Sequence, residues 1–380
     1  MASVQKVLIV GGGIGGLVAA VALRQKAPDL DVEIVEVNSK WDVYGVGIIT
    51  LANSLRALAA VGLADKVLAA GYGMDKVDFF DGEGNFLHSV PQPRLAGPQY
   101  PSANALTRPR LHAILQEAVH AAGVPVRLGV TVAELRQTAE AVEVTFTDDT
   151  RDRYDLVIGA DGIRSLVRQL VFGPQYQPRF TGQMIWRCNV PRPPAVTNFQ
   201  MFHGMSGNKA GFVPLAPDLM YIFLTEKPKP GAETKIPEAH LAEAFRERLM
   251  EFGGPVAAIR DTYITDPSQI VYRPFEEILL PPPWYRGRVV LIGDAAHAMS
   301  AHVAQGAAMA IEDAVVLAEE VTTKPTLQEA LNGYMARRYE RCKAQVEIAR
   351  ELARGEMEND RTVDVPGLTR KSMEIAAAPI

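Results

Sequence analysis

Three turns in this chain combine glycine with residues that can bind a nucleotide. In the first, GGGIGG, the residues Gly11, Gly13 and Gly16 stand in G-x-G-x-x-G register between an apolar run and a helical pattern. Such glycines give a tight turn, let a pyrophosphate approach the backbone, and let the helix pack closely on the strand. Glu36 follows Gly16 by twenty residues, where a carboxylate can bind the hydroxyls of an adenosine ribose. Taken alone, this turn fits NAD and FAD equally.

Two acids further along the chain favour one of these dinucleotides. Asp161, with Gly162 after it, and Asp294, with Gly293 before it, each follow a buried apolar run. Ligands of open α/β sheets bind at the carboxyl ends of the strands. NAD needs no remote carboxylate, whereas FAD has a ribityl chain whose hydroxyls Asp294 can bind. Either acid could instead cap a helix, but the three turns together indicate FAD.

The residues after Asp294 extend this prediction. Gln305 and Gly306 open a predicted helix whose free N–H groups can reach the pyrophosphate and the flavin carbonyls. The small side chain of Ala307 would let that helix lie close to the flavin. No feature marks a covalent flavin linkage, so the sequence predicts non-covalent FAD.

The elements that must position these turns begin with a βαβ unit. Val7–Val10 and Val32–Val37 are short apolar runs typical of buried strands, and Leu17–Leu23 between them is helical in pattern. A second amphipathic helix is predicted for Arg110–Gly123, and Asp155–Gly162 is a further strand that breaks at a turn.

The middle of the chain has a different character. From about Gln175 prolines become frequent, and short alternating runs predict a mostly antiparallel sheet, with a helix over Pro237–Gly253 packed on it. The buried-strand pattern returns at Arg288–Ile292, and a long helix is predicted for Leu327–Arg354.

The predicted fold is therefore α/β, with a Rossmann-like FAD-binding domain, an inserted β-sheet substrate domain and a long C-terminal helix. We expect the FAD-binding domain to comprise residues 1–72, 101–176 and 276–325. The substrate domain should comprise 73–100 and 177–275, and the C-terminal helix and tail 326–380.

The composition argues against several classes of function. The chain has 380 residues and a formal net charge of −5, which argues against nucleic-acid binding and against a polybasic membrane surface. Two cysteines give no disulfide framework and no metal-ligand spacing. No apolar run is long enough for a membrane span, and the N-terminus lacks the pattern of a signal peptide. We expect a cytoplasmic enzyme, a monomer or homodimer, without a metal site.

The three turns resemble the signatures of a known family. GGGIGG, GADGIRSLVR, and GDAAHAM followed by AQGAAMAIEDA are similar to those of the single-component flavin aromatic hydroxylases, the superfamily of p-hydroxybenzoate, salicylate and hydroxypyridine hydroxylases. The resemblance covers nearly the whole chain in order. It departs at Ala298 and Ala301, where the family often has proline, and at Ala304, where it often has glycine.

The resemblance also implies site residues. FAD contacts are implied at Ile14, Gly15, Glu36, Gly47, Arg108, Val132, Asp294 and Ala307. The loop of Asp161 and Gly162 is implied to serve both FAD and a transient NAD(P)H. Arg187, in WRCNV, is similar to a tryptophan–arginine pair of the family, and a structural role fits it equally.

The chemistry expected of such an enzyme is ring hydroxylation. The chain has one dinucleotide-binding fold, so NAD(P)H should bind only transiently, reduce the flavin and dissociate. Reaction with O2 then gives a flavin hydroperoxide that attacks an electron-rich ring, such as a deprotonated phenol. Candidates for handling the phenolic proton are His302, on the loop before Gln305, and His203 and Tyr221, on predicted strands. Each histidine could equally be structural, and Tyr221 fits a core or pocket-wall position better than an acid–base role.

Other functions share these turns. A flavin epoxidase or reductase that acts on an apolar lipid or isoprenoid would need an apolar tunnel or a membrane-binding patch. A halogenase would carry a tryptophan-rich signature in the substrate region. A binding protein of the GDP-dissociation-inhibitor type has a related glycine-rich fold, but Asp294 and Gln305-Gly306 argue against it. A plain NAD dehydrogenase is a weak third alternative.

Overall fold

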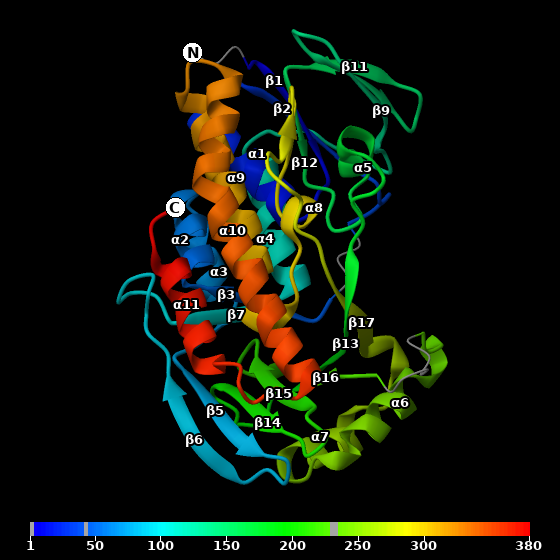
Figure 1. Ribbon diagram of the computed structural model, residues 1–380, viewed down its shortest axis with the longest axis vertical. Helices are drawn as coiled ribbons and strands as arrows, with labels where there is room; N and C mark the ends of the chain where they lie inside the picture. The colour runs from blue at the N-terminus through cyan, green and yellow to red at the C-terminus, as the bar shows by residue number, and fades with distance from the viewer. Residues whose placement is uncertain (1–3, 42–44, 229–234) are drawn as a thin grey trace.

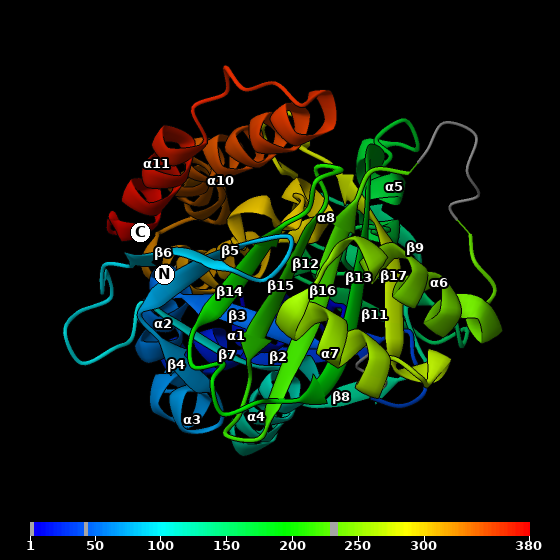
Figure 2. The ribbon, with the colours of Figure 1, turned by 90° about the horizontal axis from the view of Figure 1, so that it is seen from below.

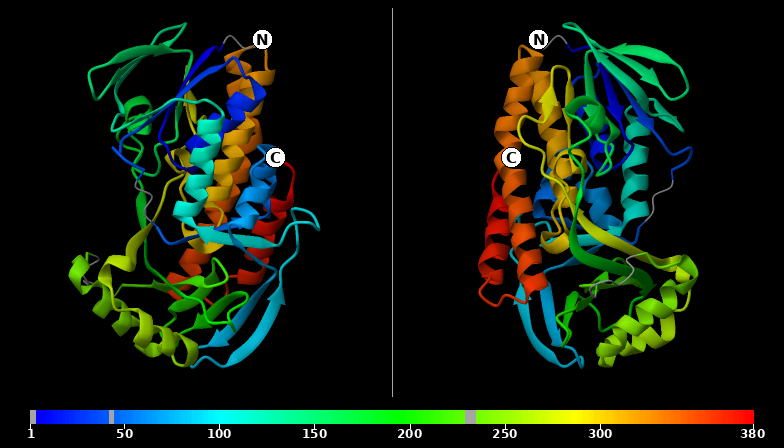
Figure 3. Two further views of the ribbon diagram at one scale, coloured as in Figure 1. Left: turned by 180° about the vertical axis from the view of Figure 1, so that it is seen from behind. Right: turned by 45° about the vertical axis from the view of Figure 1, so that its right-hand side comes forward.

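A computed structural model of the protein describes residues 4–41, 45–228 and 235–380. Two large sheets lie at opposite ends of the molecule, and the long helix α10 (Leu327–Glu358) runs beside both of them (Figures 1 and 3). The predicted α/β class, with its long C-terminal helix, is confirmed.

The six-stranded sheet brings together the segments that end in the three turns. Its order is β18-β19-β12-β1-β2-β8, and all neighbours are parallel except the edge pair β18–β19. The strands are β1 (Lys6–Val10), β2 (Asp31–Glu36), β8 (Val126–Leu128), β12 (Leu156–Gly159), β18 (Tyr285–Arg286) and β19 (Val289–Leu291). Their apolar runs are buried, as central parallel strands require. Because β1, β12 and β19 are neighbours, the three turns after them meet at one edge.

Helices pack around this sheet. Helix α1 (Ile14–Lys26) contacts both α4 (Arg108–Ala121) and α9 (Gly306–Thr323), and α10 packs on α9. The start of α10 is fixed by a capping box between Thr326 and Glu329. Shorter helices are α2 (Ala52–Ala60), α3 (Ala64–Ala69), α5 (Leu166–Phe172), α8 (Asp294–His297) and α11 (Val365–Ala377).

Two three-stranded sheets were not predicted. One has the order β11-β10-β9, from β9 (Val132–Gln137), β10 (Val142–Phe146) and β11 (Arg151–Tyr154). The other has the order β3-β7-β4, from β3 (Gly47–Leu51), β4 (Tyr72–Met74) and β7 (Ala103–Thr107). The second sheet lies between the helices and the substrate sheet (Figure 1).

The seven-stranded sheet is mostly antiparallel, as predicted, with one parallel pair, β14–β5. We call it the substrate sheet, after the role that the sequence analysis predicts for this region. Its order is β17-β13-β16-β15-β14-β5-β6. The strands are β5 (Lys76–Asp81), β6 (Phe86–Pro91), β13 (Arg179–Pro191), β14 (Phe199–His203), β15 (Lys209–Pro214), β16 (Leu219–Glu226) and β17 (Ile270–Glu277).

The two faces of the substrate sheet have different partners. Its outer face carries Trp186, Phe202 and Phe212, which pack under α6 (Leu241–Arg248) and α7 (Gly254–Tyr263) (Figure 2). Its inner face is a separate apolar cluster that contacts β7 and the residue before β3. The buried members of this inner-face cluster are Val46, Met74, Ala105, Ile185, Val213, Leu215, Tyr221, Phe223 and Phe275.

Two predicted helices need correction, and one helix was not predicted. The helix over Pro237–Gly253 is broken: Glu238–His240 and Leu249–Glu251 are 3-10 turns on either side of α6. The last long helix continues four residues beyond Arg354, to Glu358. The tail, for which the sequence predicts no element, contains α11, which Asp364 caps. Within the described residues, no helix is long and apolar enough to cross a membrane.

Candidate active site

The first glycine turn has the geometry that the sequence predicts. A Cβ at Gly16 would lie 2.0 Å from the carbonyl oxygen of Gly11, so only glycine allows helix and strand to approach this closely. A Cβ at Gly13 would meet no atom within 4 Å, so space lies open beside the helix N-terminus. Glu36 is at the turn: its Oε2 accepts a hydrogen bond of 2.8 Å from the backbone N–H of Gly12. The acid therefore also shapes the loop.

Two residues that the sequence analysis missed brace this turn. His112 Nε2 lies 2.7 Å from the carbonyl oxygen of Gly12, and the Trp41 ring packs against Gly12 and edge-on to His112. Burial lowers the pKa of His112, so the neutral ring donates Nε2–H to that carbonyl. His112 lies on α4, within the predicted amphipathic helix Arg110–Gly123, and that pattern carries no sign of this contact.

The acid of the third turn is available to a ligand. Asp294 is the first residue of α8, and Gly293 is the N-cap, with φ 59°. The Asp294 side chain is exposed and makes no hydrogen bond to any described residue. Its Oδ1 is the nearest atom to a Cβ placed at Gly306, at 4.0 Å. The carboxylate and the start of α9 therefore border one space, and Asp294 is not a helix cap.

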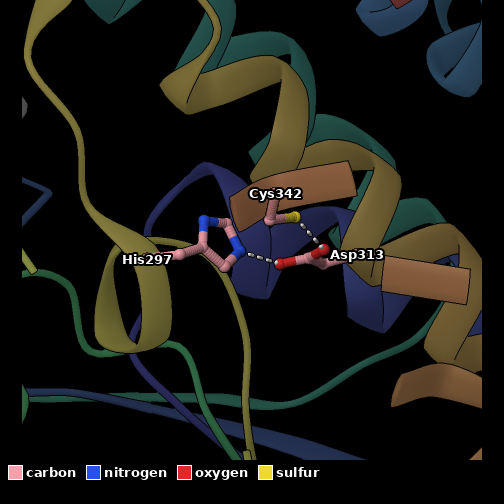
Figure 4. A group of neighbouring side chains, drawn as sticks. All are labelled: His297, Asp313 and Cys342. Atoms are coloured by element: carbon pink, nitrogen blue, oxygen red, sulfur yellow. Dashed lines mark hydrogen bonds and ion pairs between the residues drawn. The ribbon is translucent and has the colours of Figure 1, made fainter. Parts of the chain in front are cut away.

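A buried ionic network holds this turn from behind (Figure 4). One oxygen of Asp313 accepts from the Gly293 N–H at 2.9 Å and from His297 Nε2 at 2.6 Å. The other oxygen accepts from Arg338 Nε at 2.7 Å, and Cys342 Sγ lies 3.7 Å from it. Burial opposes a charged imidazole, but the Cys342 sulfur and the Asp313 carboxylate outweigh it and raise the pKa of His297.

This network also accounts for the only cluster among the described residues with spacing suited to a metal ion, namely His297, Asp313 and Cys342. Both oxygens of Asp313 already face cationic or N–H donors, and Arg338 also pairs with Glu312 at 2.6 Å. The geometry is that of a buried, hydrogen-bonded ion pair, whose role is to position the Gly293–Asp294 turn.

The second acid has a different role. Asp161 accepts from Ser165 Oγ and, at 3.0 Å, from the Val167 N–H, so its carboxylate binds the N-terminus of α5. Gly162 has φ 74°, and a Cβ placed there would meet no atom within 4 Å, so the backbone of this loop is open to a ligand. Arg168 donates to the Ile163 and Ala295 carbonyls and so joins the second turn to the third.

In the loop before α9, the side chain of Gln305 has a structural role, whereas backbone N–H groups are left for a ligand. Gln305 is buried, and its Oε1 accepts from Asn53 Nδ2 at 2.8 Å, so the side chain ties α9 to α2. The N–H groups of Gly306 and Ala307 begin the helix, and no side chain caps it. Ala304 adopts the left-handed region, with φ 52°, which is strained for a residue with a Cβ.

The positions implied by the family resemblance lie along the same region. Gly15 faces Ala310 of α9, and a Cβ placed at Gly15 would be in ordinary van der Waals contact with the Ala310 Cβ, at 3.5 Å. Ile14 starts α1, and Arg108 starts α4 with its side chain exposed. The Val132 side chain is fully buried in the core, so only its backbone can face a ligand.

The substrate sheet contributes its inner face. A Cβ at Gly47 would stand 2.4 Å from the Tyr221 ring, so this ring packs directly on the backbone at the start of β3. Burial raises the pKa of Tyr221, which makes its hydroxyl a hydrogen-bond donor, not a base. His203, at the end of β14, is exposed and stacks with Phe79 at 6.0 Å between ring centroids.

His302 is tied to the C-terminal helix. Its Nδ1 lies 2.8 Å from Ser300 Oγ, and its Nε2 lies 3.2 Å from Oε2 of Glu356, near the end of α10. Glu356 also accepts from Lys209 Nζ and, at 3.1 Å, from Gln183 Nε2. We call Ser300, His302 and Glu356 the relay. The ring stands edge-on to Phe275 at 5.5 Å, which places it beside the inner face.

These residues fit FAD. The open space at Gly13, two uncapped helix N-termini and the unpartnered carboxylate of Asp294 are the features that a pyrophosphate and a polyhydroxylated chain require. The turns that carry them end neighbouring strands, so one extended ligand can contact all of them.

Comparisons with known proteins agree with this geometry. The family model described as "FAD binding domain" matches residues 4–349. The candidate FAD-dependent monooxygenase YetM of Bacillus subtilis is 31% identical over 355 residues, 93% of this chain and 94% of that protein. The 2-heptyl-3-hydroxy-4(1H)-quinolone synthase of Pseudomonas aeruginosa is 34% identical over 316 residues, 82% of this chain and 79% of that protein.

A solved structure is also similar throughout. The crystal structure of HpxO of Klebsiella pneumoniae, complexed with FAD and uric acid, has a TM-score of 0.83 and 25% sequence identity. The match covers 98% of this chain and 93% of that chain.

Proposed function

This chain belongs to the FAD binding domain family and is an FAD-dependent monooxygenase, and we propose that its substrate is a small aromatic or N-heteroaromatic ring that carries a hydroxyl group. The relatives favour this function over the lipid epoxidase and the GDP-dissociation-inhibitor alternatives. Bound FAD, once reduced by NAD(P)H, supplies the activated oxygen atom that is transferred from O2. A cytoplasmic location and a monomeric or homodimeric state belong to the same proposal.

The observation that carries the proposal is the aromatic inner face of the substrate sheet. This face packs against the half of the molecule that contains the three turns. Tyr221 packs on Gly47, and Phe275 packs on His302, so sheet residues and turn residues form one wall. Phe199 and Phe223 continue the same aromatic face. Apolar walls with a few polar groups orient an aromatic ring and exclude water.

Within this wall, we assign the transfer of the substrate's phenolic proton to the relay. The Glu356 carboxylate can only accept, so His302 carries its hydrogen on Nε2 when neutral, and Nδ1 is then the basic nitrogen that faces Ser300. Ser300 can pass a proton to Nδ1 while its oxygen accepts the proton of the substrate hydroxyl. Tyr221 would hold the substrate ring by donating a hydrogen bond to it. His203, which is exposed, would line the rim of the substrate site.

Substrate-stimulated turnover tests the function. The purified protein, loaded with FAD, should oxidise NADH or NADPH faster when phenols, hydroxybenzoates or hydroxypyridines are added, and the product should gain one oxygen atom from labelled O2 by mass spectrometry. Stimulated oxidation that yields only peroxide with every ring offered, or a protein that cannot retain FAD, would refute the proposal.

A further inference from the structure

A buried pair of side-chain amides joins two segments that are both expected to contact FAD. Asn53 lies in the first turn of α2, directly after β3, and Gln305 lies directly before α9. Asn53 Nδ2 donates to Gln305 Oε1 at 2.8 Å, and both residues are buried. Gly47 begins β3 and Ala307 lies in the first turn of α9, so the pair connects two of the expected FAD contacts.

Packing alone does not explain an asparagine at position 53. Asn53 is 1% exposed, and its Oδ1 has no hydrogen-bond partner within the described residues. An amide that is buried with an unpaired oxygen is destabilising relative to an apolar side chain of similar volume. The contact with Gln305 is therefore the interaction that the Asn53 side chain contributes to this part of the fold.

Gln305 in turn sets where α9 begins. Its carbonyl oxygen accepts the first hydrogen bond of the helix, from the Met309 N–H at 2.9 Å. Ala304, immediately before it, has φ 52°, and a strained backbone of this kind persists only where surrounding contacts hold it. Among the described residues, the only side-chain hydrogen bond to Gln305 comes from Asn53. Asn53 therefore holds the residue from which the free N–H groups of α9 start.

The start of α9 carries a partial positive charge. The helix has 18 residues and no side-chain cap, so the N–H groups of Gly306 and Ala307 are open to a ligand. Near neutral pH a reduced flavin carries a negative charge, whereas an oxidised flavin is neutral. N–H groups aimed at bound FAD therefore bind its reduced form more strongly, and this difference depends on how firmly they are held in place.

We propose that Asn53 is a positioning residue for the flavin: by holding Gln305, it aims the N-terminus of α9 at bound FAD and so favours the reduced, negatively charged cofactor. Asn53 acts through Gln305 and not by contact with the substrate. The inference rests on FAD binding beside α9, and it does not depend on which ring the enzyme hydroxylates.

The midpoint potential of bound FAD tests the proposal. It measures the affinity of the protein for reduced FAD relative to oxidised FAD, and it needs no aromatic substrate. Asn53→Ala should lower this ratio about three- to tenfold, the range expected for a helix dipole at a partly buried site. For a two-electron couple, that change lowers the midpoint potential by about 15 to 30 mV.

Two further variants test whether the contact itself is the cause. Gln305→Ala removes the other half of the pair and should lower the midpoint potential to the same extent. The double variant should show no further shift, because the two amides act as one unit. Since Gln305→Ala carries the prediction by itself, the proposal can be refuted even if Asn53→Ala does not fold. Flavin content and the visible spectrum report whether each variant is folded and loaded.

Ser54→Ala is the matched control. Ser54 is the next residue of α2 and is equally buried, but its hydroxyl donates to the Leu51 carbonyl, at 2.7 Å, and not to α9. The change should therefore leave the midpoint potential at the wild-type value.

Several results would overturn the proposal. One is an unchanged midpoint potential in Asn53→Ala or Gln305→Ala. Others are an equal shift in Ser54→Ala or additive shifts in the double variant, because the amide contact would then not be the source. Equal weakening of the binding of oxidised and reduced FAD would mean that Asn53 only supports the fold. Oxygen transfer to an added ring is measured separately, so each of these results leaves the proposed function to its own test.

Discussion

Removing the charge of Glu356 should destabilise the protein in a way that depends on pH. Glu356 joins three parts of the fold: the loop of His302, the strands that carry Lys209 and Gln183, and the end of α10. Glu356→Gln keeps the volume of the side chain but removes the negative charge that faces His302 and Lys209. The change therefore tests whether this contact is a strong buried interaction or an incidental one.

The magnitude follows from the pKa of the carboxyl group. Burial alone would raise that pKa, but the hydrogen bonds and charges of His302 and Lys209 outweigh it and lower the pKa from 4.5 to about 2. A difference of this size between folded and unfolded chains corresponds to about 3 kcal/mol. Because the folded pKa is the lower one, this stability is present above about pH 4.5 and is lost as the pH falls toward 2.

Urea denaturation of the wild type and the variant, both saturated with FAD, measures the effect. Glu356→Gln should be less stable by about 3 kcal/mol near neutral pH and by about half of that near pH 3. The matched control is Glu351→Gln on the same helix: Glu351 is exposed and pairs with Arg354, so its loss should change stability little at any pH.

Two results would refute this reasoning. One is a Glu356→Gln protein as stable as the wild type at neutral pH, which would mean that the ion pairs only balance the cost of burying the carboxylate. The other is a stability difference that stays constant down to about pH 3, which would mean that the charge is not its source.

Three further predictions concern the turns at the cofactor. Asp294→Ala should weaken FAD binding by about ten- to over a hundredfold, since a ribityl hydroxyl loses a charged acceptor; an unchanged dissociation constant would show that the acid does not bind the cofactor. His302→Gln should keep FAD bound and reducible by NAD(P)H but release peroxide in place of hydroxylated product, and unaltered coupling would make His302 purely structural. Ala304→Gly should raise the free energy of unfolding by roughly 1 kcal/mol at most, seen as a higher urea midpoint, because glycine relieves the left-handed backbone; a lower midpoint would contradict this.

The sequence alone was sufficient for the fold class and for the shape of the first turn. The alternation of apolar runs with helical patterns encodes local conformation, and parallel strands of one sheet must end at one edge. Gly13 and Gly16 could be assigned separate roles because each role, open space for a phosphate or close packing of the helix, is a property of the turn itself. Asp294 was predicted as a ligand-binding acid from a weaker signal, its place after a buried strand.

The same pattern did not distinguish Asp161 from Asp294. Both follow a buried strand, but Asp161 accepts hydrogen bonds from Ser165 and from the start of α5, whereas the carboxylate of Asp294, at the start of α8, has no hydrogen-bond partner in the part of the chain that the structure describes. The broken helix after Pro237 was missed for a related reason. Its helical composition is continuous, but α6 ends at Arg248 and a 3-10 turn follows.

Contacts between residues far apart in the chain were decided by the tertiary structure. His302 and Glu356 are 54 positions apart, and neither carries a local sign of the other. That Arg187 has no hydrogen-bond or ion-pair partner among the described residues became visible only when strands β13, β16 and β17 were aligned and each neighbour could be identified. Periodicity records which face of an element is buried, but the hydrogen-bond partner of a buried polar group depends on which elements pack against it, and that depends on the whole fold.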